Sequence, residues 1–204
     1  MRGLAIHGGG LGLSAVSASQ RRSLIRRSLP DRALDALLPG RCTARDELVA
    51  LARLTGADSE AVDRSASRLS SYPSSGSVLG SWRLIFTTEQ SVQALSGLLG
   101  GVLGVTQEVE LETGETAPMK TVRVKNVLQW RFGGLRLEAF AIGSLVGRRL
   151  RYSFSGVSLL ADTLTLFSTS FDGPGGWSDS VYADDCVRVV RNSRADLLVF
   201  TRGP

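Results

Sequence analysis

The stretch LGSWRLIFTTEQ, residues 79–90, predicts how this chain folds. Within it Trp82, Leu84 and Phe86 alternate with a second set of side chains, and successive side chains of a β-strand point to opposite faces of its sheet. The alternation therefore predicts a strand with one broad aromatic face turned inward. That face either only fills a core or also lines a binding site.

Alternation with a period of two continues from residue 81 toward the end of the chain. The predicted strands are 81–88, 106–112, 121–131, 135–142, 148–157, 162–170, 181–190 and 196–201. Turn signals separate several of them, as in ETGET at 112–116, Gly133-Gly134 and GPGG at 173–176. About eight short strands without intervening helices predict a mainly β protein, an antiparallel up-and-down barrel. Such a barrel is either filled by its own side chains or holds one small ligand.

A short helical lead-in is predicted before the strands, over residues 43–71. Thr43 has the residue type of an N-cap, and leucines then recur at helical spacing until Gly56. Asp58 is the expected N-cap of a second helix.

Strand parity assigns eight side chains to the candidate barrel lining. They are Trp82, Leu84, Phe86, Leu128, Trp130, Leu150, Tyr152 and Phe154. Trp130 ends its strand beside the Gly133-Gly134 turn, which predicts a place near a barrel mouth, where its indole N–H would bind a ligand oxygen. Trp82 opens its strand and is expected to be a core residue. Packing alone also explains each of the eight, so a cavity and a solid interior are both open.

The sequence after residue 41 holds no recognisable catalytic constellation. His7 is the only histidine, which excludes histidine-based triads and zinc sites from the rest of the chain. HGGG at 7–10 matches an oxyanion motif, but the nucleophile elbow and the downstream histidine of that motif are missing. Asp184 and Asp185 are neighbours in a predicted strand and point to opposite faces, which predicts one exposed and one salt-bridged carboxylate. We therefore expect neither an enzyme nor a metal or other cofactor.

The excess positive charge lies at the N-terminus. Residues 1–41 hold seven of the 24 basic residues and two of the 19 acidic ones, which accounts for the whole net charge of +5. Arginine, serine and a lack of acids are typical of an organelle transit peptide, and LAIHGGGLGLSAVSA also fits the signal part of a bipartite presequence. A disordered basic tail is the alternative. The prediction is a disordered targeting presequence over 1–41 and a folded domain over 42–204.

The remaining part of the chain is neutral, which predicts no binding to nucleic acid. Its most apolar stretch, ALSGLLGGVLGV at 94–105, is too short to span a membrane as a helix. The sequence leaves open whether Cys42 and Cys186 form a disulfide, which a reducing plastid stroma would disfavour.

Several blocks of the sequence together resemble the plastid-lipid-associated protein (PAP)/fibrillin family. LGSWRLIFTTE resembles the opening strand of the family, and GVTQEVE followed by VRVKNVLQW resembles its next block. VYADDCVRVVRNSRADLLVFTR resembles the C-terminal signature. The positions that carry the resemblance are Gly80, Gln107, Asn126, Tyr182, Asp184, Asp185, Arg188, Arg191, Phe200 and Arg202. The resemblance spans about residues 42–202 and departs from the family in the glycine-rich LSGLLGGVLGV and in the turn NSRAD.

The resemblance implies a lipocalin-like barrel in plastids, at plastoglobules or thylakoid membranes. It implies a non-enzymatic protein that binds or organises hydrophobic lipids such as carotenoids or prenylquinones. The alternative is a non-catalytic partner of an enzyme of isoprenoid or lipid metabolism.

Overall fold

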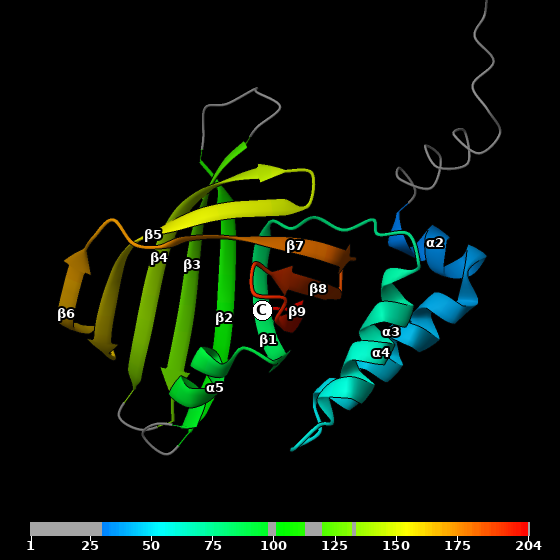
Figure 1. Cartoon of the computed structure of the whole chain (residues 1–204), viewed down its shortest axis with the longest axis horizontal. Helices are drawn as coiled ribbons and strands as arrows, with labels where there is room; N and C mark the ends of the chain where they lie inside the picture. The colour runs from blue at the N-terminus through cyan, green and yellow to red at the C-terminus, as the bar shows by residue number, and fades with distance from the viewer. Residues whose placement is uncertain (1–29, 98–100, 113–119, 132–133, 204) are drawn as a thin grey trace, which may run out of the picture.

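The computed structural model describes residues 30–97, 101–112, 120–131 and 134–203. Nine antiparallel strands form one sheet; two long helices pack against its outer side, and a short helix lies apart from them beside the strands (Figure 1). The strands are β1 (Gly80–Thr87), β2 (Val102–Leu111), β3 (Lys120–Trp130), β4 (Leu135–Val146), β5 (Arg149–Ala161), β6 (Leu164–Ser170), β7 (Gly175–Ala183), β8 (Val187–Asn192) and β9 (Leu197–Arg202). The helices are α2 (Asp31–Leu37), α3 (Pro39–Ala52), α4 (Ser59–Ser70) and α5 (Gln90–Gly97).

Eight of the nine strands close into a ring. The order is β4-β3-β2-β1-β9-β8-β7-β5, and β4 also pairs with β5. The ring closes because β5 is long enough to have two partners on one edge. Its first half, from Arg149 to Ser153, pairs with β7, and its second half, from Gly156 to Ala161, pairs with β6. The mainly β, antiparallel, barrel-like architecture expected from the sequence is confirmed, with β6 attached outside the ring.

The predicted strand 181–190 is wrong, because a turn divides it between β7 and β8. Asp184 forms this turn without glycine or proline. Its Oδ1 accepts hydrogen bonds from the backbone N–H groups of Cys186 (2.8 Å) and Val187 (2.7 Å). The turn raises the number of strands to nine. Most of the predicted turn at 112–116, and Gly133, lie outside the described residues.

Two predicted helices are present with shifted limits. Helix α3 begins at Pro39, so Thr43 lies inside it instead of capping it. Helix α4 has the predicted N-cap, because Asp58 accepts a hydrogen bond from the Glu60 N–H at 3.0 Å. Both helices bury leucines and valines against side chains of β8 and β9, such as Val189 and Val199. They cover the outside of the ring at β8 and β9. Helix α5 was not predicted.

The folded part begins before residue 42, which corrects the predicted domain boundary. Helix α2 starts at Asp31, and the Arg41 side chain is completely buried. Its guanidinium donates to the Tyr182 hydroxyl at 2.8 Å and to Asp35 at 2.8 Å. The basic composition of residues 1–41 suggested a single presequence, but the last part of that segment, from Asp31 onward, belongs to the folded unit. Residues 1–29 lie outside the described part.

Candidate functional site

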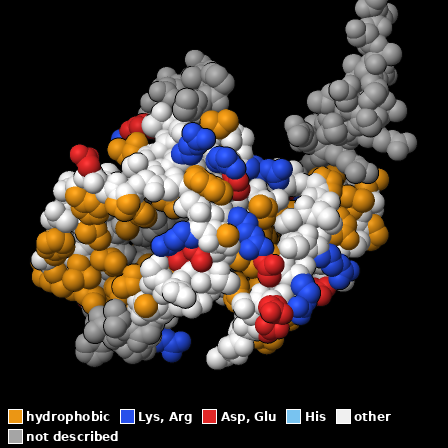
Figure 2. All heavy atoms as spheres, viewed as in Figure 1, with side chains coloured by type: hydrophobic (Ala, Val, Ile, Leu, Met, Phe, Trp, Pro, Cys, Tyr) orange, Lys and Arg blue, Asp and Glu red, His pale blue; other side chains and the backbone are white. Residues whose placement is uncertain are grey.

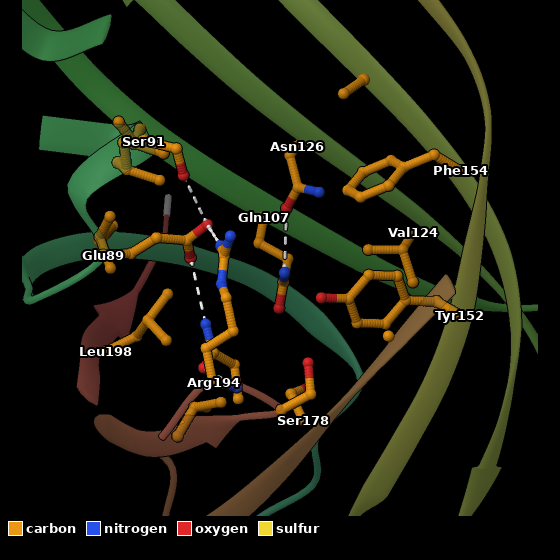
Figure 3. A pocket seen from close by; sticks show the side chains of 18 of the residues that line it. Glu89, Ser91, Gln107, Val124, Asn126, Tyr152, Phe154, Ser178, Arg194 and Leu198 are labelled. Atoms are coloured by element: carbon orange, nitrogen blue, oxygen red, sulfur yellow. Dashed lines mark hydrogen bonds and ion pairs between the residues drawn. The ribbon is translucent and has the colours of Figure 1, made fainter. Parts of the chain in front are cut away.

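A cavity of about 500 Å³ lies inside the strand ring (Figure 3). Most of its wall is apolar. The apolar lining residues include Leu84, Val92, Leu95, Val105, Val124, Leu128, Leu137, Ala139, Phe154, Val190, Leu198 and Phe200. The polar ones include Glu89, Ser91, Gln107, Asn126, Tyr152, Ser178, Asn192 and Arg194. An apolar cavity with a few polar groups is the usual form of a small-molecule site.

Four of the eight residues that strand parity assigned to the barrel lining do line the cavity. Leu84, Leu128, Tyr152 and Phe154 all face the cavity. The register explains how they meet, because Leu84 of β1 pairs with Val105 of β2, and Val105 pairs with Leu128 of β3. Neighbouring strands therefore present adjacent side chains to one space.

The other four predicted lining residues do not border the cavity. Trp82 is fully buried, and its indole N–H donates to the Val78 carbonyl oxygen at 2.9 Å, so the expectation of a core residue is confirmed. Leu150 is fully buried in a core cluster that adjoins the cavity at Val124 and does not itself border the empty space. Trp130 is also buried, and its indole nitrogen has no hydrogen-bond partner among the described residues. Alternation along a strand predicts to which face of the sheet a side chain points, but it does not predict how far along the ring axis that side chain lies.

Phe86 faces the other side of the sheet. The pairing of β1 with β9 shifts register between Leu84 and Phe86, which is a β-bulge. A bulge changes the side to which the following residues point. Phe86 therefore packs against the cluster formed with the helices, and the prediction that it lines the cavity is wrong.

A chain of three polar side chains runs from the core into the cavity wall. Arg188 donates from Nη1 to Oε1 of Gln107 at 2.8 Å, and Gln107 donates from Nε2 to Oδ1 of Asn126 at 2.9 Å. Sequence resemblance placed these three residues in a structural signature. The structure adds that Gln107 and Asn126 also line the cavity. Figure 3 shows the bond between these two amides in the cavity wall.

Arg188 is a buried cation without a carboxylate partner among the described residues. Burial lowers the pKa of its guanidinium to about 9, which leaves it protonated at neutral pH. It donates from Nε to the Ser180 hydroxyl at 2.9 Å, and it lies over the rings of Trp82 and Phe200. The described residues offer Arg188 no salt bridge, and its contact with a carbonyl group is at the side-chain oxygen of Gln107.

Charged groups border the cavity only where α5 meets the β8–β9 turn, as far as the described residues show. Glu89 Oε1 accepts from Arg194 Nη2 at 2.5 Å and from the Ser91 hydroxyl at 2.8 Å (Figure 3). Arg194 is largely exposed, so this ion pair marks the end of the cavity that is nearest to solvent. Sequence reasoning missed the pair because its members are far apart along the chain.

A second polar cluster lies away from the cavity and joins the helices to the C-terminal signature. Asp184 Oδ2 accepts from the Tyr182 hydroxyl at 2.8 Å and forms salt bridges with Arg41 (3.5 Å) and Arg45 (3.4 Å). Asp184 is buried and Asp185 is exposed, so the prediction of one salt-bridged and one exposed carboxylate is confirmed. Burial and the nearby Asp184 raise the pKa of Tyr182.

Gly80 has a packing role in the same signature. Its φ of +111° favours glycine, and a Cβ there would lie 3.0 Å from the Arg202 guanidinium. That guanidinium lies over the Trp82 ring, 4.6 Å from its centroid.

The described residues include no group of three or more metal-ligating side chains, and none of their helices is both long and apolar enough to cross a membrane. Cys42 and Cys186 are free thiols in this structure. Comparison with protein-family models, with curated proteins and with solved structures finds no match for the chain. The resemblance to the fibrillin family therefore stays a prediction based on the quoted sequence blocks.

Proposed function

We propose that this protein binds a hydrophobic lipid inside its strand ring and acts as a lipid-binding or lipid-organising protein. The cavity of about 500 Å³ with its apolar wall is the observation that carries the proposal. That volume lies within the usual range of small-molecule sites, about 300–1,000 Å³. It suits the ring or head of a carotenoid, prenylquinone or similar lipid, with the remainder of the tail outside.

A non-catalytic role is proposed from the chemistry of the wall. Glu89, Arg194 and Tyr152 are the titratable side chains of the described lining, and the first two are paired with each other. The carboxylate beside the Ser91 hydroxyl is therefore held by a guanidinium on the same oxygen, which weakens it as the base that acid–base or covalent catalysis requires.

A plastid location, at plastoglobules or thylakoid membranes, is proposed from the composition of residues 1–29 and from the sequence resemblance. This segment is rich in arginine and serine and has no acidic residue. A fluorescent reporter fused to residues 1–41 tests the location. Accumulation in plastids supports it, and a reporter that stays in the cytosol or enters only mitochondria contradicts it.

Peripheral contact with a membrane or lipid-body surface is proposed from exposed apolar side chains around β6. Leu164, Leu166 and Phe167 are each more than half exposed, and Phe171 follows them. Figure 2 shows hydrophobic side chains gathered over the β6 side of the molecule. Exposed apolar patches of this kind mark interaction sites.

The second candidate function is docking on an enzyme of isoprenoid or lipid metabolism. The free edge of β6 favours it, because among the described strands β6 pairs with β5 alone, and an exposed edge can accept a strand from a partner. Recovery of an enzyme with a protein that carries no lipid would favour this function over lipid binding.

Filling the cavity tests the main proposal. Ala139 of β4 faces the cavity, and Ala139→Phe would occupy part of it. Ile142 on the same strand is half exposed and does not border the cavity, so Ile142→Phe is the matched control. We expect the full chain and the control to bind the neutral apolar dye N-phenyl-1-naphthylamine and to release it to added lipid. The Ala139→Phe variant, shown to be folded by circular dichroism, should not bind it. Absence of dye and lipid binding in the unmodified chain would refute the proposal.

A further inference from the structure

We infer that the cavity selects apolar ligands that carry a neutral carbonyl oxygen, held by the side-chain amide of Asn126 and the hydroxyl of Tyr152. This inference rests on the proposed function, because it assumes that an apolar molecule occupies the ring. It adds the chemical class of the ligand and the residues that recognise it.

The orientation of the Asn126 amide follows from the cation behind it. A guanidinium can only donate hydrogen bonds, so the group of Gln107 that faces Arg188 Nη1 at 2.8 Å must be the carbonyl oxygen. The Gln107 NH₂ group then faces Asn126 at 2.9 Å, where it requires an acceptor. The Asn126 Oδ1 therefore accepts the hydrogen bond from Gln107 and is not available to a ligand. Its Nδ2 has no partner among the described residues and remains as a donor at the cavity.

Tyr152 supplies a second donor from the facing wall. Its hydroxyl has no hydrogen-bond partner among the described residues, although the side chain lines the cavity. In Figure 3 this hydroxyl points toward Gln107 and Asn126, and the Ser178 hydroxyl is directed toward the same part of the cavity. Burial raises the pKa of Tyr152, and the Glu89 charge adds to this effect, so the hydroxyl keeps its proton at neutral pH.

The charge distribution favours an oxygen that is partly negative but not ionised. Arg188 brings an uncompensated positive charge close to the amide pair, whereas the lining carboxylate, Glu89, is bound to Arg194. An acceptor oxygen on the ligand is stabilised by this field. A ligand carboxylate at the amide pair would lose its hydration without contacting a cation directly, because Gln107 lies between this place and Arg188.

The rest of the ligand must be apolar. The same cavity wall includes the apolar side chains of Leu128, Leu137, Ala139 and Phe154. An oxygen left unpaired among these side chains would cost binding energy, so the ligand oxygen is expected at the amide–hydroxyl pair.

A series of long-chain compounds of equal length tests the inference on the full chain. The methyl ketone, alcohol, fatty acid and hydrocarbon compete with N-phenyl-1-naphthylamine, and their dissociation constants are compared. We expect the ketone to bind most tightly. The Tyr152→Phe variant removes one donor without changing the shape of the wall, and one hydrogen bond corresponds to about a three- to tenfold change in affinity. Affinity for the ketone should fall by that factor, and affinity for the hydrocarbon should not change.

Two controls separate the outcomes. Tyr72→Phe makes the same chemical change in the helical layer, outside the cavity, and should leave all four affinities unchanged. Equal affinities for ketone and hydrocarbon, or no effect of Tyr152→Phe on the ketone, would overturn the inference while lipid binding stands. Tightest binding of the fatty acid would also overturn it, because the site would then select a carboxylate. Failure of every compound to displace the dye from a binding-competent chain would overturn both the inference and the proposed function.

Discussion

Replacing Arg188 by methionine should change ligand selectivity much more than stability. The arginine is completely buried, and its hydrogen-bond acceptors are the neutral side chains of Gln107 and Ser180. Methionine is similar in length and shape and carries no charge. The Arg188→Met substitution therefore removes a buried cation and two donors without opening a large cavity.

The two energetic consequences of Arg188→Met oppose each other. The depression of the Arg188 pKa to about 9 corresponds to about 5 kcal/mol of unfavourable burial, which the substitution relieves. Each acceptor left without a donor costs about 1–3 kcal/mol, so two acceptors cost about 2–6 kcal/mol. The net change in the free energy of unfolding should lie between about 3 kcal/mol of stabilisation and about 1 kcal/mol of destabilisation, or within about 12 °C in Tm for a chain of this size.

Thermal unfolding and ligand competition together check this reasoning. Arg188→Ala is the matched variant, because it removes the same charge but leaves empty space, which costs about 2–5 kcal/mol in addition. We expect Arg188→Met to unfold at a clearly higher temperature than Arg188→Ala. Without Arg188 the Gln107 amide can turn, so the Met variant should lose its preference for the ketone and still bind the hydrocarbon. Equal destabilisation of the two variants would refute the reasoning and show that the charge itself stabilises the fold.

Three further predictions concern the folded unit as a whole. A chain that begins at Pro30 should keep its Tm, whereas one that begins at Cys42 should lose about 3–5 kcal/mol, because loss of Arg41 leaves buried Asp184 with Arg45 alone and removes the guanidinium from the buried Tyr182 hydroxyl; equal Tm values would contradict this. Burial opposes ionisation of Asp31, but hydrogen bonds from Ser75 and Arg41 outweigh it and hold the pKa of its carboxyl below 3.8. The stability that Asp31 contributes should therefore be complete above pH 3.8 and be lost as pH falls below it, and urea unfolding should show a weaker acid dependence in Asp31→Asn than in the unmodified chain. The chain from Pro30 onward should not shift DNA or RNA in a gel at physiological salt; tight, salt-sensitive binding would overturn the prediction from charge.

The sequence predicted the sheet well because strand alternation is a local property. Each of the strands from 81 to 170 is close to a predicted one, and the antiparallel ring follows from tight connections between them. The failure came at Asp184, where a carboxylate bonded to two backbone N–H groups makes a turn inside a continuous apolar pattern. No glycine or proline marks that turn, so the alternation on either side was interpreted as one strand.

The cavity could be predicted only in part, because side-chain parity is not the same as position. The bulge after Leu84 turned Phe86 to the helical side, and a bulge of this kind leaves no reliable pattern in the sequence. Leu150 has the parity of Tyr152, yet it is fully buried in the core cluster against which Tyr152 packs, and it does not border the cavity. The Glu89–Arg194 pair joins segments whose proximity depends on the complete ring. Local pattern therefore indicates which face is apolar, and closure of the ring decides which apolar residues surround empty space.

Arg41 and Arg188 show why residue type and burial alone do not define a role. Both side chains are completely buried. Burial alone would lower the pKa of Arg41, but Asp31 and the other acidic groups around it outweigh that effect and raise it, so Arg41 holds the helices to the C-terminal turn. Around Arg188 the described residues offer no such compensation, and its pKa is lowered. A cation that is costly to bury adds little net stability. The donors of Arg188 nevertheless fix the orientation of the Gln107 amide and, through it, that of the Asn126 amide. This is the reason to assign Arg41 to the fold and Arg188 to the arrangement of the cavity wall.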